Sequence, residues 1–335
     1  MLPPTNNHSP TPKRHHAYTL VFLLVLLVIV GVLASQRQAL YDQWRLYNYV
    51  APTAVANLAT QDTMTAYARR IFYVNHPKIT SGSDFSLSCP NNGGEKTIIL
   101  GCYHGGQLGI TLLAVNDPLL NGVEQVTAAH EMLHSAYDRL SSSEKKRVDT
   151  MLQDYYQTGL KDQRIVSILD AYRKSEPNDV VNEMHSIFGT EISNLPPSLE
   201  QYYKRYFTNR AQVAAFAAHY QSEFTSRQAF ISSASAQLVV LKSQIDSLES
   251  DLAVKLAAIN TERSRLDALR HSDPAAYNAS IASYNQLVDS YNVEVNRLQA
   301  LINQYNTLVD RMNAVALEEN QLVKELSGTS TTINN

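Results

Sequence analysis

Hydrophobic and polar positions divide the chain into three stretches. Residues 17–34 form an uncharged apolar run, about as long as the shortest helix that spans a bilayer. The middle of the chain alternates short helical patterns with turn-forming Gly, Pro and Asn. From residue 198 to residue 327 glycine is absent and apolar residues recur at spacings of three and four, which predicts long helices.

These patterns predict a mostly α-helical protein with a small β-hairpin or sheet. A polar lead-in precedes the apolar run, and a polar tail follows the last helical pattern. The expected parts are residues 1–16, a disordered tail; 17–35, a transmembrane anchor or signal peptide; 36–70, a juxtamembrane helical segment; 71–210, a central domain; 211–327, a coiled-coil hairpin; and 328–335, a disordered tail.

The long polar lead-in favours an uncleaved membrane anchor over a signal peptide. A cleaved signal peptide stays open as the alternative, because Val32-Leu33-Ala34 offers small or branched residues where a signal peptidase needs them. Under both readings residues 36–335 lie outside the cytoplasm. We therefore expect a single-pass protein of the plasma membrane, with the bulk of its chain extracytoplasmic.

Charge and cysteine content narrow the class of protein further. The net charge is −3 and Lys and Arg form no dense patch, which argues against a nucleic-acid partner. Cys89 and Cys102 are the only cysteines and lie on either side of a Gly-rich segment. Because such a pair closes in an oxidising compartment, we expect a disulfide, with two free buried thiols as the alternative.

The middle of the chain contains two strand candidates, residues 97–103 and 109–115, on either side of a turn at residues 104–107. An exposed edge of this hairpin is able to hold an extended peptide by backbone pairing. Strand-like composition also occurs at residues 71–74. Downstream, turn and capping signals predict helices at 141–158, 162–174 and 180–188, the last ended by Gly189, and then a long helix that starts at Pro196.

Residues 126–140 contain the motif His130-Glu131-x-x-His134 within an uninterrupted helical pattern. Residues four apart share one face of a helix, so both imidazoles can reach the same metal ion. Zinc accepts neutral imidazole, and Glu131 would then be the general base that takes a proton from a water. The alternative is an amphipathic helix with two incidental histidines.

A catalytic zinc needs a third protein ligand, and four downstream residues are candidates. Glu183 lies in a short apolar helical pattern, where a carboxylate is costly unless it is paired or bound to a metal. Glu191 and His185 are weaker candidates. His185 faces another side of the helix, so a supporting role beside the metal, or that of a polar helix residue, is expected. Asp138 lies four residues after His134 and is placed to orient an imidazole, with a helix-end salt bridge or cap as the alternative.

HExxH followed by Asn182-Glu183 on a later helix resembles the gluzincin metallopeptidases over about residues 95–195. In that family the motif supplies two zinc ligands and a Glu, often after Asn, supplies the third. The resemblance implies a zincin-like α+β catalytic domain, Zn²⁺ as cofactor and Glu183 as the third ligand. The chain departs from thermolysin-like members in its longer spacing between His134 and Glu183, which leaves room for two extra helices.

The last third of the chain carries two apolar seams of similar length, separated by a break at residues 271–274. Asp273 is placed as the N-cap and Pro274 as the first residue of the second helix. The four-three alternation predicts a coiled coil, and the tight break favours an antiparallel hairpin over a parallel oligomer. Self-association or an envelope partner is expected to use this hairpin.

The function expected from these features is that of a membrane-anchored, extracytoplasmic zinc metallopeptidase acting on a peptide or protein substrate. The alternative from another class is a catalytically inactive, zincin-like envelope scaffold that acts through its coiled coil. A third interpretation makes the zinc purely structural. It requires a fourth protein ligand, such as His185 or Asp138.

Overall fold

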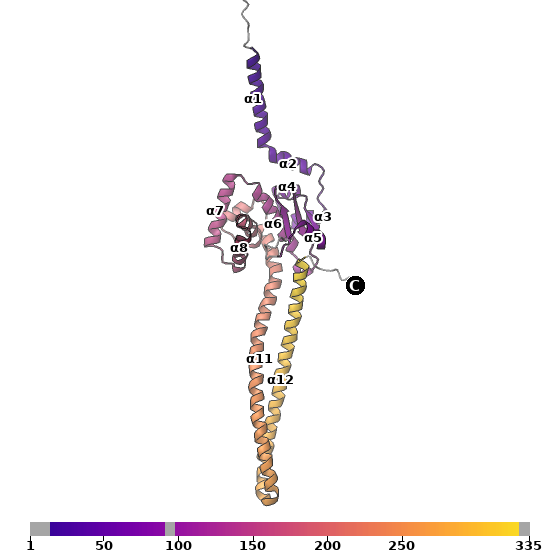
Figure 1. Ribbon diagram of the computed structural model, residues 1–335, viewed down its shortest axis with the longest axis vertical. Coiled ribbons are helices and arrows are strands. Elements are labelled where there is room, and N and C mark those ends of the chain that lie inside the picture. Colours follow the sequence, from indigo (N-terminus) through magenta and orange to yellow (C-terminus); the bar gives the residue numbers. More distant parts are fainter. Residues whose placement is uncertain (1–13, 91–97, 328–335) are drawn as a thin grey trace, which may run out of the picture. The chain divides into compact units, whose positions relative to one another are not determined.

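The computed structural model describes residues 14–90 and 98–327, where the protein is mostly helical with one three-stranded sheet (Figure 1). The segments 1–13, 91–97 and 328–335 lie outside the described residues and include the predicted C-terminal tail and most of the predicted tail at residues 1–16. Residues 14–16, expected in that tail, instead begin the first helix, because the helical pattern of the apolar run extends back to Arg14. The chain divides into two compact units. The first unit is Met1–Ile79, Gly101–Leu112 and Ala128–Gln212, and the second unit is Thr80–Leu100, Leu113–Thr127 and Val213–Asn335.

Helix α1, Arg14–Ser35, contains the predicted apolar run. Its window Tyr18–Ser35 is long and apolar enough to cross a membrane, and none of that window is buried in the protein. Apolar side chains exposed along a whole helix are stable in lipid rather than in water. The helix is therefore compatible with single-pass anchoring.

Three short helices follow α1: α2, Arg37–Leu46; α3, Thr53–Gln61; and α4, Ala66–Val74. The expectation of strand character at residues 71–74 was wrong. Those residues complete α4, whose first turn is capped by Thr65 and whose buried face includes Ile71, Phe72 and Val74. The apolar run that resembled a strand is thus one buried stripe of a helix.

The sheet contains β1, Lys78–Thr80; β2, Gly101–His104; and β3, Gly109–Leu113, in the order β1-β3-β2. β2 and β3 form the expected antiparallel hairpin, in which Gly101 pairs with Leu112 and His104 with Gly109. β2 begins later than the sequence indicated, at Gly101, and β3 ends earlier, at Leu113. β1 was not predicted because a three-residue strand has no detectable period. Both cysteines are disulfide-bonded, so the expected Cys89–Cys102 bond is present.

Two short helical elements, α5, Gly82–Ser88, and the 3₁₀ helix η1, Pro118–Leu120, lie on either side of the hairpin in the chain. Five helices follow: α6, Val123–Asp138; α7, Ser142–Thr158; α8, Gln163–Ser175; α9, Val180–Glu191; and α10, Pro197–Tyr203. Ser141 and Glu144 form the expected capping box of α7, and Asp162 caps α8.

Two helix boundaries differ from the sequence prediction. Gly189 does not end α9, because it serves close packing: a Cβ there would lie 2.5 Å from a Leu133 methyl carbon and 2.8 Å from the Tyr203 ring. Pro197 begins only the seven-residue α10, and the long helix starts later, at Arg210. The guanidinium of Arg210 is buried and donates to the carbonyl oxygen of Ser193 at 3.0 Å, which fixes that start.

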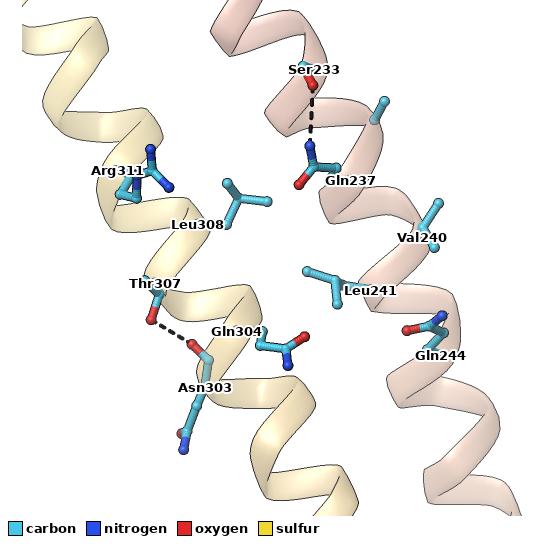
Figure 2. A pocket seen from close by; sticks show the side chains of 11 residues that line it. Ser233, Gln237, Val240, Leu241, Gln244, Asn303, Gln304, Thr307, Leu308 and Arg311 are labelled. Carbon is cyan, nitrogen blue, oxygen red and sulfur yellow. Dashed lines mark hydrogen bonds between the residues drawn. The ribbon is translucent and has the colours of Figure 1, made fainter.

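Helices α11, Arg210–Ser272, and α12, Pro274–Leu326, run side by side and antiparallel (Figure 1). Asp273 caps α12 as predicted, accepting a hydrogen bond from the Ala276 amide at 3.1 Å. Figure 2 shows a cleft between them, about 830 Å³, into which Leu241 and Leu308 point. The helical hairpin expected from the two seams is therefore present.

Candidate metal centre

Helix α6 holds both histidines of the HExxH motif in the first unit. Its apolar residues Ala129, Met132, Leu133 and Ala136 are buried, which fixes how the helix is rotated. His130 is partly exposed and His134 is buried, and their Nε2 atoms lie 3.0 Å apart. Two imidazole nitrogens this close form one donor pair, as the spacing of four residues predicts.

Helix α9 supplies a carboxylate to the same place. Glu183 is buried on α9, and its Oε2 lies 3.5 Å from His130 Nε2 while its Oε1 lies 3.4 Å from His134 Nε2. One ligand atom from each of these residues lies within 4.8 Å of the others. Among the described residues, His130, His134 and Glu183 form a group of side chains that could hold a metal ion.

The geometry of these donors fits zinc. Zinc–nitrogen and zinc–oxygen bonds of about 2.1 Å at tetrahedral angles place neighbouring donor atoms roughly 3.3 Å apart, close to the 3.4 and 3.5 Å found between Glu183 and the imidazoles. Glu183 Oε2 is buried without a hydrogen-bond partner, and a bound cation would compensate its charge. Two imidazoles and one carboxylate also match a catalytic zinc site, which leaves one position open.

The charge of Glu183 is set by two opposing effects. Burial raises the pKa of its carboxyl. The interactions with His134 and His130 together lower the pKa by more than burial raises it, so the pKa of Glu183 lies below its ordinary value. Glu183 is therefore an anion at neutral pH. An anionic ligand beside two imidazoles favours a divalent cation.

Glu131 lies on α6 directly after His130 and is also buried. A carboxylate next to two clustered imidazoles is the residue type that accepts a proton from a water in metal-assisted hydrolysis. The motif therefore places an acidic side chain on the same helix as both imidazoles.

The structure separates the other candidate ligands from this cluster. Glu191 lies eight residues beyond Glu183 on α9, about 12 Å along the helix axis, and its carboxylate accepts a hydrogen bond from Arg164 at 2.7 Å. Asp138 accepts a hydrogen bond from the Tyr103 hydroxyl at 2.8 Å, so the partner found for it is a phenol and not an imidazole.

His185 lies in a buried aromatic cluster behind the site. Its Nε2 lies 2.8 Å from the Tyr202 hydroxyl, and the Tyr203 hydroxyl donates to the His185 carbonyl oxygen at 2.7 Å. Burial, reinforced by repulsion from His134 and His130, lowers the pKa of His185 to about 3, so the ring is neutral. The Tyr202 hydroxyl also lies 3.1 Å from the Tyr206 hydroxyl. The two tyrosines recur four residues apart, a helical spacing that could have indicated this cluster from sequence.

In comparisons with known proteins, no protein family, no curated protein and no solved structure matches this chain. The donor geometry of His130, His134 and Glu183 is therefore the feature that points to a function.

Proposed function

We propose that the protein is a membrane-anchored, extracytoplasmic zinc metallopeptidase with a gluzincin-like, zincin-type catalytic domain. The observation that carries this proposal is the convergence of His130, His134 and Glu183, with Glu131 on the same helix. The hydrophobic helix α1 supports anchoring to a membrane.

The residues have distinct roles in the proposed reaction. His130, His134 and Glu183 hold the ion, and Glu131 accepts the proton of the attacking water and later passes it to the leaving amine. Zinc, when bound, lowers the pKa of a water towards about 7 and polarises the peptide carbonyl. The neutral His185 and its tyrosine partners support α9 from behind, which keeps Glu183 in position.

The sheet edge suggests how a peptide is held. β2 is an edge strand, and the Tyr103 hydroxyl on it donates to Asp138 at the end of α6 at 2.8 Å. An edge strand offers free backbone donors and acceptors to an extended chain. We propose that substrate pairs with this edge.

Glu131→Gln in the full chain tests the mechanism. The variant is expected to retain zinc, because the three ligands are unchanged, and to lose peptidase activity by about 100-fold or more, because general-base catalysis contributes 10²–10⁴-fold. Glu176→Gln, an exposed Glu in the same unit, is the matched control and is expected to keep full activity. Wild-type activity in Glu131→Gln would refute the proposed reaction.

A second candidate function is a scaffold that acts through a coiled coil formed by α11 and α12. Exposed apolar side chains on these helices, among them Val239, Val254 and Val293, favour it, since such residues mark binding surfaces. Metal analysis separates the two: absence of zinc from the purified full chain supports the scaffold. A purely structural zinc would need a fourth ligand, and the positions found for His185 and Asp138 argue against it.

A further inference from the structure

Helix α2 contacts the rest of the first unit through a polar stripe. Gln38, Asp42 and Arg45 recur at helical spacing on one face. Asp42 is buried and accepts hydrogen bonds from Arg139 and Arg70, both at 2.9 Å, and Gln38 donates to the Gln107 amide oxygen at 2.9 Å. Arg45 Nε donates to the Val74 carbonyl oxygen at 3.0 Å. The inward face of α2 is thus held by charge and hydrogen bonds.

The opposite face of α2 is apolar and exposed. Leu40 and Trp44 are 47% and 70% exposed, and Tyr47 and Val50, just beyond the helix, are 82% and 86% exposed. These four residues are named the outward stripe. A surface helix normally buries its apolar stripe and leaves its polar face to water. The reversal in α2 means that the outward stripe lacks its cover in the described part of the protein.

The chain itself indicates what covers the outward stripe. α1, whose apolar window ends at Ser35, is separated from α2 by the single residue Gln36. Leu40 follows five residues after Ser35, so it lies within about 18 Å of the end of that window even if the linker is extended. Trp and Tyr are the residues that concentrate at membrane–water interfaces, because their rings are apolar with one polar edge. An exposed stripe of this composition, tethered this close to an apolar span, has the residue types of a membrane-interface segment.

A cleft lies beside the outward stripe. It measures about 570 Å³ and is lined by Leu40, Trp44, Tyr49 and His76, among others. Tyr49 stacks on the His76 ring at 4.4 Å between centroids, and His76 Nε2 lies 2.8 Å from the Arg45 carbonyl oxygen. The cleft floor is therefore fixed by contacts within the first unit.

We propose that the outward stripe of α2 is a membrane-binding face that inserts at the boundary between lipid headgroups and acyl chains. An amphipathic helix in that plane buries its apolar side chains about 5–10 Å deep. Because the other face of α2 contacts Arg139, Arg70 and Gln107, this insertion fixes the first unit, including its metal centre, against the bilayer. The proposal does not depend on the peptidase activity.

Trp44 makes the proposal directly measurable, because it is the only tryptophan in the chain. The full chain is reconstituted in phosphatidylcholine vesicles, with and without brominated acyl chains, and Trp44 emission is recorded. The expected result is a blue-shifted emission, strong quenching by bromines near the headgroup end of the chain, weaker quenching by bromines near the methyl end, and protection from aqueous acrylamide. Red-shifted emission that acrylamide quenches and bromolipid does not would overturn the proposal.

Two variants separate lipid contact from mere proximity to α1. Leu40→Ser combined with Tyr47→Ser removes two members of the outward stripe, and should cut bromolipid quenching at least in half and restore acrylamide access. Leu317→Ser, at an exposed Leu of α12, is the matched control and should change neither readout. A third outcome would also refute a lipid partner: Trp44 is protected from acrylamide but is not quenched by bromolipid, and the protection falls as the protein density in the vesicles is lowered. That result would mean that a second copy of the chain covers the stripe.

Discussion

Arg139, the residue after α6, donates two hydrogen bonds to Asp42 of α2, at 3.1 and 2.9 Å. Only 4% of the Arg139 side chain and 6% of the Asp42 side chain are exposed. A paired guanidinium and carboxylate in this bidentate arrangement are strong partners, and each is costly alone in a buried position. The ion pair links α2 to the end of the helix that carries HExxH, within the first unit.

Asp42→Ala is expected to destabilise the first unit by about 3–5 kcal/mol, because it leaves the Arg139 charge buried without its carboxylate. In a unit of this size, such a loss lowers the melting temperature by roughly 6–20 °C. Thermal unfolding of the detergent-solubilised full chain, followed by circular dichroism, measures it.

Asp154→Ala, at an exposed Asp of α7, is the control and should leave the melting temperature unchanged. Asp42→Leu combined with Arg139→Met should recover most of the loss, since a buried ion pair can be replaced by apolar residues of similar volume. Equal melting temperatures for Asp42→Ala and wild type would show that the pair contributes nothing.

The choice of third ligand gives a second prediction. Glu183→Gln should weaken zinc binding by at least about 100-fold, because even residues that only support metal ligands contribute 10–100-fold. Glu191→Gln should leave zinc affinity unchanged, since Glu191 contacts Arg164 instead. Competition of the purified protein with a chromogenic zinc chelator measures both. The opposite ranking of the two variants would assign the ligand to Glu191.

His185 predicts how stability depends on pH. Its pKa is lowered from 6.5 to about 3, chiefly by burial, so below pH 6.5 the unfolded chain takes up a proton that the folded protein excludes. His185 therefore contributes stability above pH 6.5 that is progressively lost as the pH falls towards 3.

His185→Gln, which keeps a polar group near the Tyr202 hydroxyl, should flatten the fall of the melting temperature between pH 6.5 and pH 3 relative to wild type. His219→Gln, at an exposed position on α11, should not flatten it. Parallel curves for wild type and His185→Gln would mean that His185 is already protonated or accessible in the folded protein.

The sequence alone determined the features that depend on neighbours along the chain. His130 and His134 share a face because a helix repeats every 3.6 residues, and the capping box of α7 and the Asp273 cap of α12 are likewise local. The apolar window of α1 follows from composition. The helical hairpin also followed from its seams and from Pro274, since a tight break returns the chain alongside itself.

Only the tertiary structure decided the rest, because it depends on which surfaces pack together. The sequence favoured Glu183 over Glu191 from local pattern alone. Only the structure brings Glu183 beside both imidazoles and Glu191 against Arg164. Gly189 resembles a helix stop in the sequence, whereas in the structure it lies within α9 and packs closely against Leu133 and Tyr203. The polar stripe of α2 likewise turned inward because Arg139 and Arg70, distant in sequence, meet Asp42 there, which leaves Trp44 and its apolar neighbours facing out.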